Sequence, residues 1–376
     1  MLEVKSMDII GVIAEYNPFH NGHSYHIKKI KEMYPDSLII GVVSSCFCQR
    51  GEISVLNKWD KCDIALSEGI DIVIELPFVY STQSADKFAY GALKLLNHMG
   101  VKKIIFGSEC NDVEKLKDIA TRQLDKSIDE KVKQYLDKGL NYPTALAKAI
   151  DCDIDSPNDL LGISYIKQIL INNYNIEAIT IKRTNDYHGK DKNKSNIISA
   201  SSIRNLIDQN KNIKKYVPKN VNKYIYNNTD YFNLLKYKIL SDINILNTYQ
   251  TVDEGIEGRI KKYIYNSNNL DELINNIKTK RYTYNKINRM FIHILTSLTK
   301  EEAQLDISYV RVLGFKESAK SYLNKIKKEI NIPLITSYKN MNNELLNIEY
   351  RVNSIYSLIV NDKSLIKREL DKPIIK

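Results

Sequence analysis

The sequence predicts an α/β N-terminal domain, built on a doubly wound parallel sheet, followed by a mainly α-helical C-terminal region. In the first half, short Ile- and Val-rich runs alternate with helical segments, as expected of parallel strands that helices cover on both faces. From about residue 216 onward, the pattern changes to helical repeats of Ile, Leu and Tyr with many Lys and Asn. The 376 residues are enough for two domains, which we place at 1–215 and 216–376.

Five strands are expected in the first domain. Each run is short and apolar on both faces, which is typical of a parallel strand with right-handed crossover connections. The expected strands are Asp8–Glu15, Ser37–Ser44, Ile70–Leu76, Val101–Phe106 and Ala178–Lys182. Ligands in such sheets bind beyond the carboxyl ends of the strands.

The expected helices lie between these strands. They are Gly22–Met33, Asn57–Glu68 and Ser84–His98, and residues 113–175 are also expected to be mainly helical. The polar stretch that follows the fifth strand reads as a basic loop, and "SASSIRNLI" starts another helix. In the C-terminal region, two short strands at Ser308–Leu313 and Pro333–Ser337 are expected to interrupt the helices.

The composition limits the classes of protein to which the chain can belong. Hydrophobic residues make up 43% and charged residues 27% of the chain, as in ordinary globular proteins. No apolar run approaches the roughly 18 residues of a membrane span, so we expect no membrane association. Five cysteines without a repeated spacing favour reduced thiols and a cytoplasmic location. The net charge of +10 is compatible with a polyanionic partner such as RNA, although a biased genome explains it equally well.

Three of the six histidines fall within "EYNPFHNGHSYH", at the end of the first strand. His20 and His23 are three residues apart at the start of a helix, so they share one face. The N–H groups and the dipole at a helix N-terminus favour an anion. Pro18 fixes the entry of the turn, and Gly22 permits the close approach of a bulky ligand. Two imidazoles here suit the phosphates of a nucleotide, whereas a pair of surface or capping histidines is the plainer alternative.

A second anion-binding candidate is the turn "SASSIR". Ser201 and Ser202 are expected to cap the helix that carries Arg204, which would bring hydroxyl groups, N–H donors and a cation together. Contact with phosphate is favoured over a plain N-cap.

The stretch "PFHNGH" resembles the H-x-G-H motif of the nucleotidyltransferase and class I synthetase superfamily, and longer segments resemble the tRNA(Met) cytidine acetate ligase family. The resemblance covers nearly the whole chain. It is carried by "GVIAEYNPFHNGHSYH", "QRGE", "KWDKCDIAL", "GIDIVIELPFVYSTQSADKFAYGAL", "FGSE", "SPNDLLGISYI", "IKRTNDYH", "SASSIR", "RYTYNKINRMFIHIL" and "YVRVLGF".

The resemblance implies a nucleotidyltransferase-like Rossmannoid fold and a two-step reaction. Acetate attacks the α-phosphate of ATP to give acetyl-adenylate and pyrophosphate, and the wobble cytidine of elongator tRNA(Met) then takes the acetyl group to form N4-acetylcytidine. His20 and His23 are the implied catalytic residues. Mg²⁺ is expected to arrive with ATP. No carboxylate cluster announces a metal cage, so no residue is assigned as a metal ligand, and no obligate protein partner is evident.

The resemblance also implies an ATP site. Its members are Ile13, Ala14, Glu15, Tyr16, Asn17, Pro18, Phe19, His20, Asn21, Gly22, His23, Ser24, Tyr25, His26, Gly107, Asn158 and Arg183, to which we add Ser201, Ser202 and Arg204. Gly107 follows a strand end, where adenosine could lie against the backbone. Asn158 can bond to ribose or simply cap its helix. Arg183 can hold phosphate bidentately, or it is a solvated charge.

Other candidates have weaker support. Arg50, Glu52 and Glu109 border the expected crevice, where they could orient acetate or tRNA or pair with one another. Tyr187 and His188 could stack on anticodon bases or serve packing. The residues proposed for tRNA binding are Lys190, Lys192, Lys194, Lys280 and Arg281, within wider basic groups.

Two alternatives to the ligase remain at this stage. A small-molecule adenylyltransferase would use the same H-x-G-H and SASSIR elements, but such enzymes are usually compact single domains. A non-catalytic RNA-binding protein with a decayed nucleotide fold is the other, and the intact His20, Gly22 and His23 argue against it.

Overall fold

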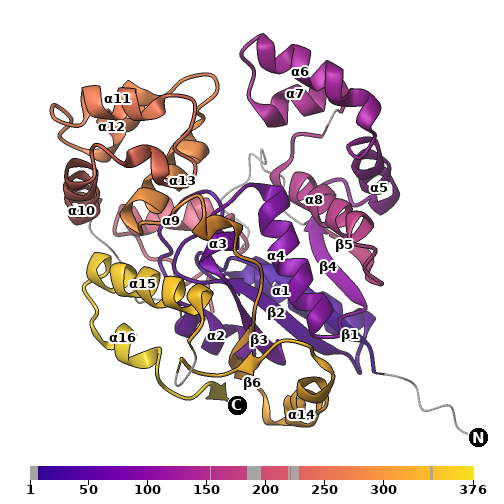
Figure 1. Cartoon of the computed structure of the whole chain (residues 1–376). Coiled ribbons are helices and arrows are strands. Elements are labelled where there is room, and N and C mark those ends of the chain that lie inside the picture. Colours follow the sequence, from indigo (N-terminus) through magenta and orange to yellow (C-terminus); the bar gives the residue numbers. More distant parts are fainter. Residues whose placement is uncertain (1–6, 153, 184–195, 219–220, 222–227, 339–341) are drawn as a thin grey trace, which may run out of the picture.

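The computed structural model of the chain describes residues 7–152, 154–183, 196–218, 221, 228–338 and 342–376 (Figure 1). Its centre is an eight-stranded sheet in the order β5-β4-β1-β2-β3-β6-β7, with β8 paired to β6. The first five strands are β1 (Ile9–Ala14), β2 (Leu38–Ser44), β3 (Ile72–Leu76), β4 (Lys103–Ser108) and β5 (Glu177–Lys182). All pairs among them are parallel, so the predicted doubly wound parallel sheet is confirmed.

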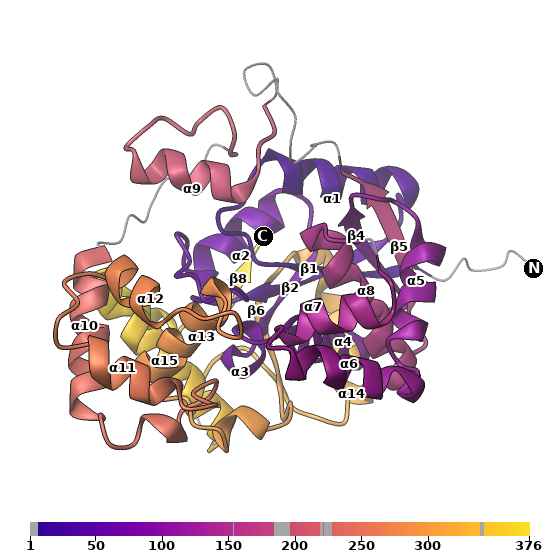
Figure 2. The ribbon, with the colours of Figure 1, turned by 90° about the horizontal axis from the view of Figure 1, so that it is seen from above.

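Helices cover both faces of this sheet because side chains alternate along each strand. Ile10 and Val12 of β1 share an apolar core with α1 (Asn21–Met33) and α2 (Lys58–Ser67). The other core includes Ile9 of the same strand, together with α4 (Ala85–His98), α5 (Val113–Arg122) and α8 (Pro157–Ile171). Figure 2 shows these two layers, with α9 (Ala200–Asp208) beside α1.

Side-chain caps fix where several helices begin. Asn57, Ser84 and Thr283 each accept a backbone N–H from the first turn of α2, α4 and α13, respectively. The other helices of the described residues are α3 (Phe78–Ser81), α6 (Asp129–Asp137), α7 (Tyr142–Ala149), α10 (Asn228–Ser241), α11 (Ile256–Tyr263), α12 (Leu270–Ile277), α13 (Tyr284–Leu295), α14 (Lys320–Glu329), α15 (Glu344–Ile359) and α16 (Ser364–Arg368).

The C-terminal half adds strands to the same sheet. β6 (Val310–Phe315) runs antiparallel to β3, and β7 (Leu334–Ile335) and β8 (Ile374–Ile375) run parallel to β6. The two short strands expected near residues 308 and 333 are therefore present as β6 and β7. The division at residue 215 stays a prediction, but part of the C-terminal half extends the N-terminal sheet.

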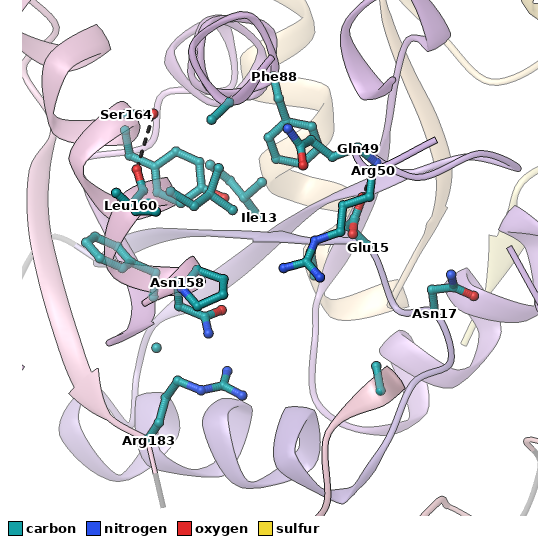
Figure 3. Close-up of a pocket in the computed structure, with 18 of the residues that line it drawn as sticks. Ile13, Glu15, Asn17, Gln49, Arg50, Phe88, Asn158, Leu160, Ser164 and Arg183 are labelled. Atoms are coloured by element: carbon teal, nitrogen blue, oxygen red, sulfur yellow. Dashed lines mark hydrogen bonds between the residues drawn. The ribbon is translucent and has the colours of Figure 1, made fainter. Parts of the chain in front are cut away.

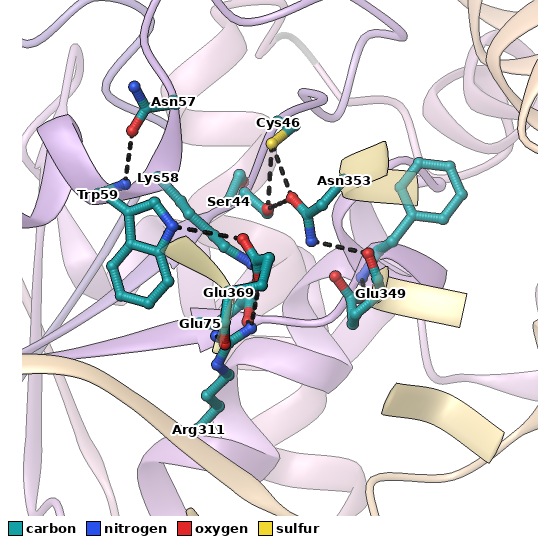
Figure 4. Close-up of polar contacts among 12 residues, drawn as sticks. Ser44, Cys46, Asn57, Lys58, Trp59, Glu75, Arg311, Glu349, Asn353 and Glu369 are labelled. Atoms are coloured by element: carbon teal, nitrogen blue, oxygen red, sulfur yellow. Dashed lines mark hydrogen bonds and ion pairs between the residues drawn. The ribbon is translucent and has the colours of Figure 1, made fainter. Parts of the chain in front are cut away.

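A buried cluster of charges joins these parts of the chain (Figure 4). Lys58 Nζ lies 2.7 Å from Glu75 Oε1 and 2.8 Å from Glu369 Oε2, and Arg311 Nη1 contacts Glu75 and Glu369 at 3.1 and 2.7 Å. All four side chains are at most 2% exposed. They come from α2, β3, β6 and the end of α16, so one ionic cluster connects the first half of the chain to its last residues.

Among the described residues, none of the helices combines the length and the apolar character that crossing a bilayer requires.

Candidate active site

A cavity of about 760 Å³ opens at the carboxyl ends of β1, β4 and β5 (Figure 3). This is the edge at which open α/β sheets bind their ligands. The start of α1, the start of α8 and the turn before α9 form its polar walls. Residues of α7 and α13 complete it, so the cavity lies between the sheet and both the hairpin α6–α7 and the C-terminal helices.

His20 and His23 close the N-terminus of α1 as a reciprocal cap. The Gly22 N–H donates to His20 Nδ1 at 3.0 Å, and the His20 N–H donates to His23 Nδ1 at 3.1 Å. The two rings stack with centroids 3.8 Å apart. A Nδ1 that accepts a backbone N–H carries no proton, so each neutral ring has its proton on Nε2. The two histidines thus cap the helix through Nδ1 and carry N–H donors at Nε2.

The same environment keeps these imidazoles neutral. Burial, followed by the positive charge of Arg183, lowers the pKa of His20 to about 4. The pKa of His26 falls to about 4 for the same two reasons. Burial also lowers the pKa of His23, with further contributions from His20, Arg183 and His26. Without an anion nearby, all three rings are therefore neutral at pH 7.

Gly22 makes room for a neighbouring ring of its own chain. A Cβ at this position would lie 2.8 Å from His20 Cε1 and 2.9 Å from His20 Nδ1. The histidine cap therefore requires a glycine here, and the role of Gly22 in the approach of a ligand stays a prediction. Gly107 also lies close to a side chain of the protein itself, because a Cβ there would lie 3.2 Å from Cγ of Arg183.

Arg183 ends β5 and faces the cavity (Figure 3). Its Nε lies 3.4 Å from Glu109 Oε1, and the Asn158 amide donates to the same carboxylate oxygen. Glu109 thus orients two of the predicted ATP-site residues. Asn158 is the second residue of α8, whose N-cap position is Ser156, so the capping alternative for Asn158 is wrong.

The SASSIR turn also lines the cavity, and its cap differs from the prediction. Ser199 is the N-cap of α9 and accepts the Ser202 N–H at 3.1 Å. Ser201 and Ser202 belong to the first turn, so the expectation that they cap the helix is wrong. Arg204 anchors α9, because it donates to the Asn17 carbonyl at 2.7 Å and pairs with Glu52 at 2.7 Å.

Most of the predicted ATP-site residues line this one cavity. They are Ile13, Ala14, Glu15, Tyr16, Asn17, His20, Gly22, His23, Tyr25, His26, Gly107, Asn158, Arg183, Ser201 and Arg204. Five others do not line it: Pro18, Phe19, Asn21, Ser24 and Ser202. Phe19 packs in the core against Tyr16 and His23. Asn21 holds the α9 segment through the carbonyls of Asn196 and Lys215.

Only some of the residues predicted to bind RNA belong to the described part of the chain. Lys190, Lys192 and Lys194 lie outside the described residues, as do Tyr187 and His188. Lys280 and Arg281 are exposed just before α13. Arg281 donates to the carbonyl of Leu136 on α6 at 3.4 Å and lies two residues before Thr283, which lines the cavity. Their role in tRNA binding stays a prediction.

The structure adds residues that the sequence did not single out for this site. Arg289 of α13 lines the cavity and donates to the Gln49 carbonyl at 3.3 Å, and burial lowers its pKa to about 10. From the sequence, it looked like one of several surface cations. Tyr142 of α7 also lines the cavity. Only tertiary packing brings α7 and α13 to this edge, so no local pattern could have identified them.

The arrangement suits chemistry at phosphorus. It combines a helix N-terminus, two imidazole N–H donors and a guanidinium group around one partly enclosed space. Fixed donors of this kind stabilise charge as it develops on phosphoryl oxygens.

Comparisons with known proteins agree with this geometry. The family model described as HIGH Nucleotidyl Transferase matches residues 7–371. A tRNA(Met) cytidine acetate ligase of Fusobacterium nucleatum is 38% identical over 95% of this chain and 96% of the relative. One of Caldicellulosiruptor bescii is 39% identical over 95% of each.

Solved structures give the same result for the fold. The apo structure of Thermotoga maritima TmcAL covers 98% of this chain with 99% of its own, at a TM-score of 0.89 and 27% identity. A second structure of that protein, bound with alpha-thio ATP, matches at a TM-score of 0.87 and 26% identity. The resemblance seen in the sequence is thereby confirmed: the chain belongs to the HIGH nucleotidyl transferase family and, within it, to the tRNA(Met) cytidine acetate ligases.

Proposed function

We propose that this protein is an ATP-dependent ligase that activates acetate as acetyl-adenylate and transfers the acetyl group to N4 of the wobble cytidine of elongator tRNA(Met). The names of the relatives, which match over nearly the whole chain, support this substrate pair. The observation that carries the proposal is the reciprocal histidine cap of α1, because both rings line the cavity and their Nδ1 atoms are already engaged by backbone N–H groups.

In the first step, a carboxylate oxygen of acetate bonds to the α-phosphorus of ATP. The bond between that phosphorus and the bridging oxygen breaks, and pyrophosphate leaves with the electron pair. Both reactants are anions, so positioning and charge neutralisation must supply most of the acceleration. His20 and His23, as Nε2–H donors, stabilise the phosphoryl oxygens at the transition state, and Arg183 neutralises charge beside them.

In the second step, the exocyclic amine of cytidine attacks the acetyl carbonyl carbon. AMP leaves with the electron pair of the carbon–oxygen bond, and the nitrogen loses one proton. The RNA base would enter the cavity on the side lined by Tyr142 and Arg289. The exposed Lys280 and Arg281 would contact phosphates of the tRNA. A cytoplasmic location is part of this proposal, because the proposed substrate is a tRNA.

Mg²⁺ belongs to this proposal only as the companion of ATP. Each described carboxylate that lines the cavity already has a partner: Glu52 pairs with Arg204, Asp86 with Lys167, and Glu15 accepts the Gln49 N–H. Glu109, outside the lining, pairs with Arg183. Among the described residues, no group of three acidic, histidine or cysteine side chains is placed to hold an ion. That part of the chain therefore offers no cage, and phosphate oxygens and water would coordinate the ion.

The first test is incubation of the purified protein with ATP, Mg²⁺, labelled acetate and bulk tRNA. We expect label in tRNA(Met) that disappears when ATP is omitted. If ATP binds but no label enters RNA, acetate or RNA is the wrong substrate. Transfer of AMP to a small phosphorylated acceptor would then favour an adenylyltransferase.

A further inference from the structure

A tight turn between β2 and α2 carries Arg50 to the edge of the cavity. Phe47 and Ile53 pair as an antiparallel bridge, the Cys48 N–H donates to the Glu52 carbonyl at 2.9 Å, and the Gly51 N–H donates to the Cys48 carbonyl at 2.9 Å. Arg50 therefore sits at the tip of a short, closed hairpin.

This hairpin is fastened to its surroundings on several sides. The Gln49 N–H donates to Glu15 at 2.5 Å, and its amide donates to the Gln83 carbonyl at 2.9 Å. Glu52 is paired with Arg204 of α9. Gly51, at a φ of 75°, packs so closely on α13 that a Cβ would lie 2.2 Å from the backbone nitrogen of Arg289. The backbone at Arg50 is thus held against the sheet, α9 and α13 together.

The guanidinium of Arg50 differs from the other charged groups that line the cavity. Within the described part of the chain, Glu15, Glu52, Asp86, Lys167, Lys182, Arg183, Arg204 and Arg289 all make a hydrogen bond or ion pair. The Arg50 side chain makes none there. Burial raises the pKa of Glu15, and the positive charge of Arg50 is one of the influences that lower it. Figure 3 shows Arg50 and Arg183 reaching into the cavity from opposite sides. A rigid turn therefore presents an unpaired cation to the ligand space.

The surroundings of Arg50 indicate the kind of anion it receives. Other donors suited to a polyphosphate line the same cavity at the starts of α1 and α9 and at Arg183. In Figure 3, Ile13 and Phe88 lie on the side of the cavity away from Arg183, and Phe88 is only 1% exposed. A guanidinium forms forked hydrogen bonds to a carboxylate, and a small apolar wall accommodates an alkyl group of limited length.

We propose that Arg50 binds the carboxylate of the short-chain acid that is activated at this site, and that Phe88 and Ile13 receive its alkyl group and limit its length. This inference rests on the proposed function and specifies its acid-binding part. Arg50 would neutralise one acetate oxygen while the other attacks the α-phosphorus, which reduces the repulsion between the two anions.

The test is acetate-dependent exchange of pyrophosphate into ATP by the full-length protein without tRNA. For Arg50→Gln, we expect the KM for acetate to rise by about 10- to 100-fold, the effect of losing a charge-assisted hydrogen bond. Binding of ATP, measured separately without acetate, should remain that of the wild type. Arg50→Lys should recover part of the loss, because it keeps the charge but not the planar fork.

Two comparisons make the result specific. Lys325→Gln removes one positive charge from the exposed surface of α14 and should change neither the KM for acetate nor the affinity for ATP. Phe88→Leu shortens the apolar wall and should raise kcat/KM for propionate relative to acetate. If the wild type shows no acetate-dependent exchange, the proposed function and this inference both fail. If the wild type is active while Arg50→Gln keeps its KM for acetate or instead weakens ATP binding, this inference alone is overturned.

Discussion

His20 shows how one side chain can serve both the fold and the chemistry. Its Nδ1 accepts the Gly22 N–H and thereby caps α1, while the proton on Nε2 remains available to a ligand. A substitution that kept only the capping function would separate the two roles. Asn is such a residue, because it ranks among the best N-caps and carries no imidazole.

We therefore expect His20→Asn to fold like the wild type and to lose acetyl-adenylate formation by about 100-fold or more, as when one donor to a developing charge is removed. The measurements are thermal unfolding and acetate-dependent pyrophosphate exchange. His20→Ala, which loses the cap as well, should in addition be less stable by about 1 kcal/mol. Full turnover in the Asn variant would show that the ring does not act on the phosphate.

Protonation of His20 should make stability depend on pH. The pKa of the folded-state ring is about 4, below its ordinary value of 6.5, so the unfolded state binds the proton more readily between these values. The free energy of unfolding should therefore be unaffected by this ring above pH 6.5, fall as pH drops from 6.5 to 4, and level off below that.

The loss from His20 should be on the order of 2–3 kcal/mol across that window. Denaturant titrations at pH 7.5, 6.0 and 4.5 would measure it, with His20→Asn as the reference that lacks the titrating group. The variant should lose less stability than the wild type between pH 6.5 and 4. Equal losses in the two proteins would contradict the depressed pKa.

At the scale of elements, the start of α1 depends on Gly22 having no side chain. A Cβ at residue 22 would lie within 3.0 Å of two atoms of the His20 ring, so the ring must shift. Gly22→Ala should thus reduce adenylation by at least about tenfold, since a misplaced catalytic group is costly. Gly258 of α11 is the matched control, because a Cβ there meets nothing within 4 Å.

Gly258→Ala should leave activity unchanged and raise stability by up to about 1 kcal/mol through helix propensity. Pyrophosphate exchange and thermal unfolding of both variants would provide the comparison. Wild-type activity in Gly22→Ala would show that the ring position is not set by this glycine.

The elements that the sequence predicts well are those with a strong local signal. The runs of Ile and Val locate β1 to β5 within about two residues, because strands covered on both faces are apolar throughout. The pairing of β6 with β3 could not be predicted in this way. The run at residues 310–315 looks like any short strand, and its position in the sheet depends on contacts more than two hundred residues apart.

The same distinction holds within the site. The H-x-G-H and SASSIR segments identify two walls of the cavity because their chemistry is concentrated in a few adjacent residues. Their internal bonding was predicted less well, since Ser199 rather than Ser201 caps α9. Arg289 reaches the cavity through the packing of α13, and nothing in its local sequence distinguishes it from the basic group that includes Lys280 and Arg281.

At the scale of the whole molecule, the ionic cluster of Lys58, Glu75, Arg311 and Glu369 decides how the two halves of the chain depend on each other. Two cations face two carboxylates with almost no exposure to water. Loss of one member would leave an uncompensated charge in the core, which costs far more than loss of a surface pair. The second half of the chain supplies two of the four members, so neither half buries its own charges alone.

Arg311→Met should therefore lower the free energy of unfolding by about 3–5 kcal/mol, because Lys58 alone would face two buried carboxylates. Lys320→Met, at the first residue of α14, removes the partner of the exposed Glu317 and should change the free energy of unfolding by no more than about 1 kcal/mol. Denaturant unfolding would measure both, with fluorescence of Trp59 beside the cluster and far-UV circular dichroism of the whole chain as the two probes. Because the cluster joins β3 to β6, the two probes should report the same shifted transition in Arg311→Met. A loss confined to part of the helical signal would instead mean that the halves unfold independently and that the division near residue 215 separates two autonomous domains.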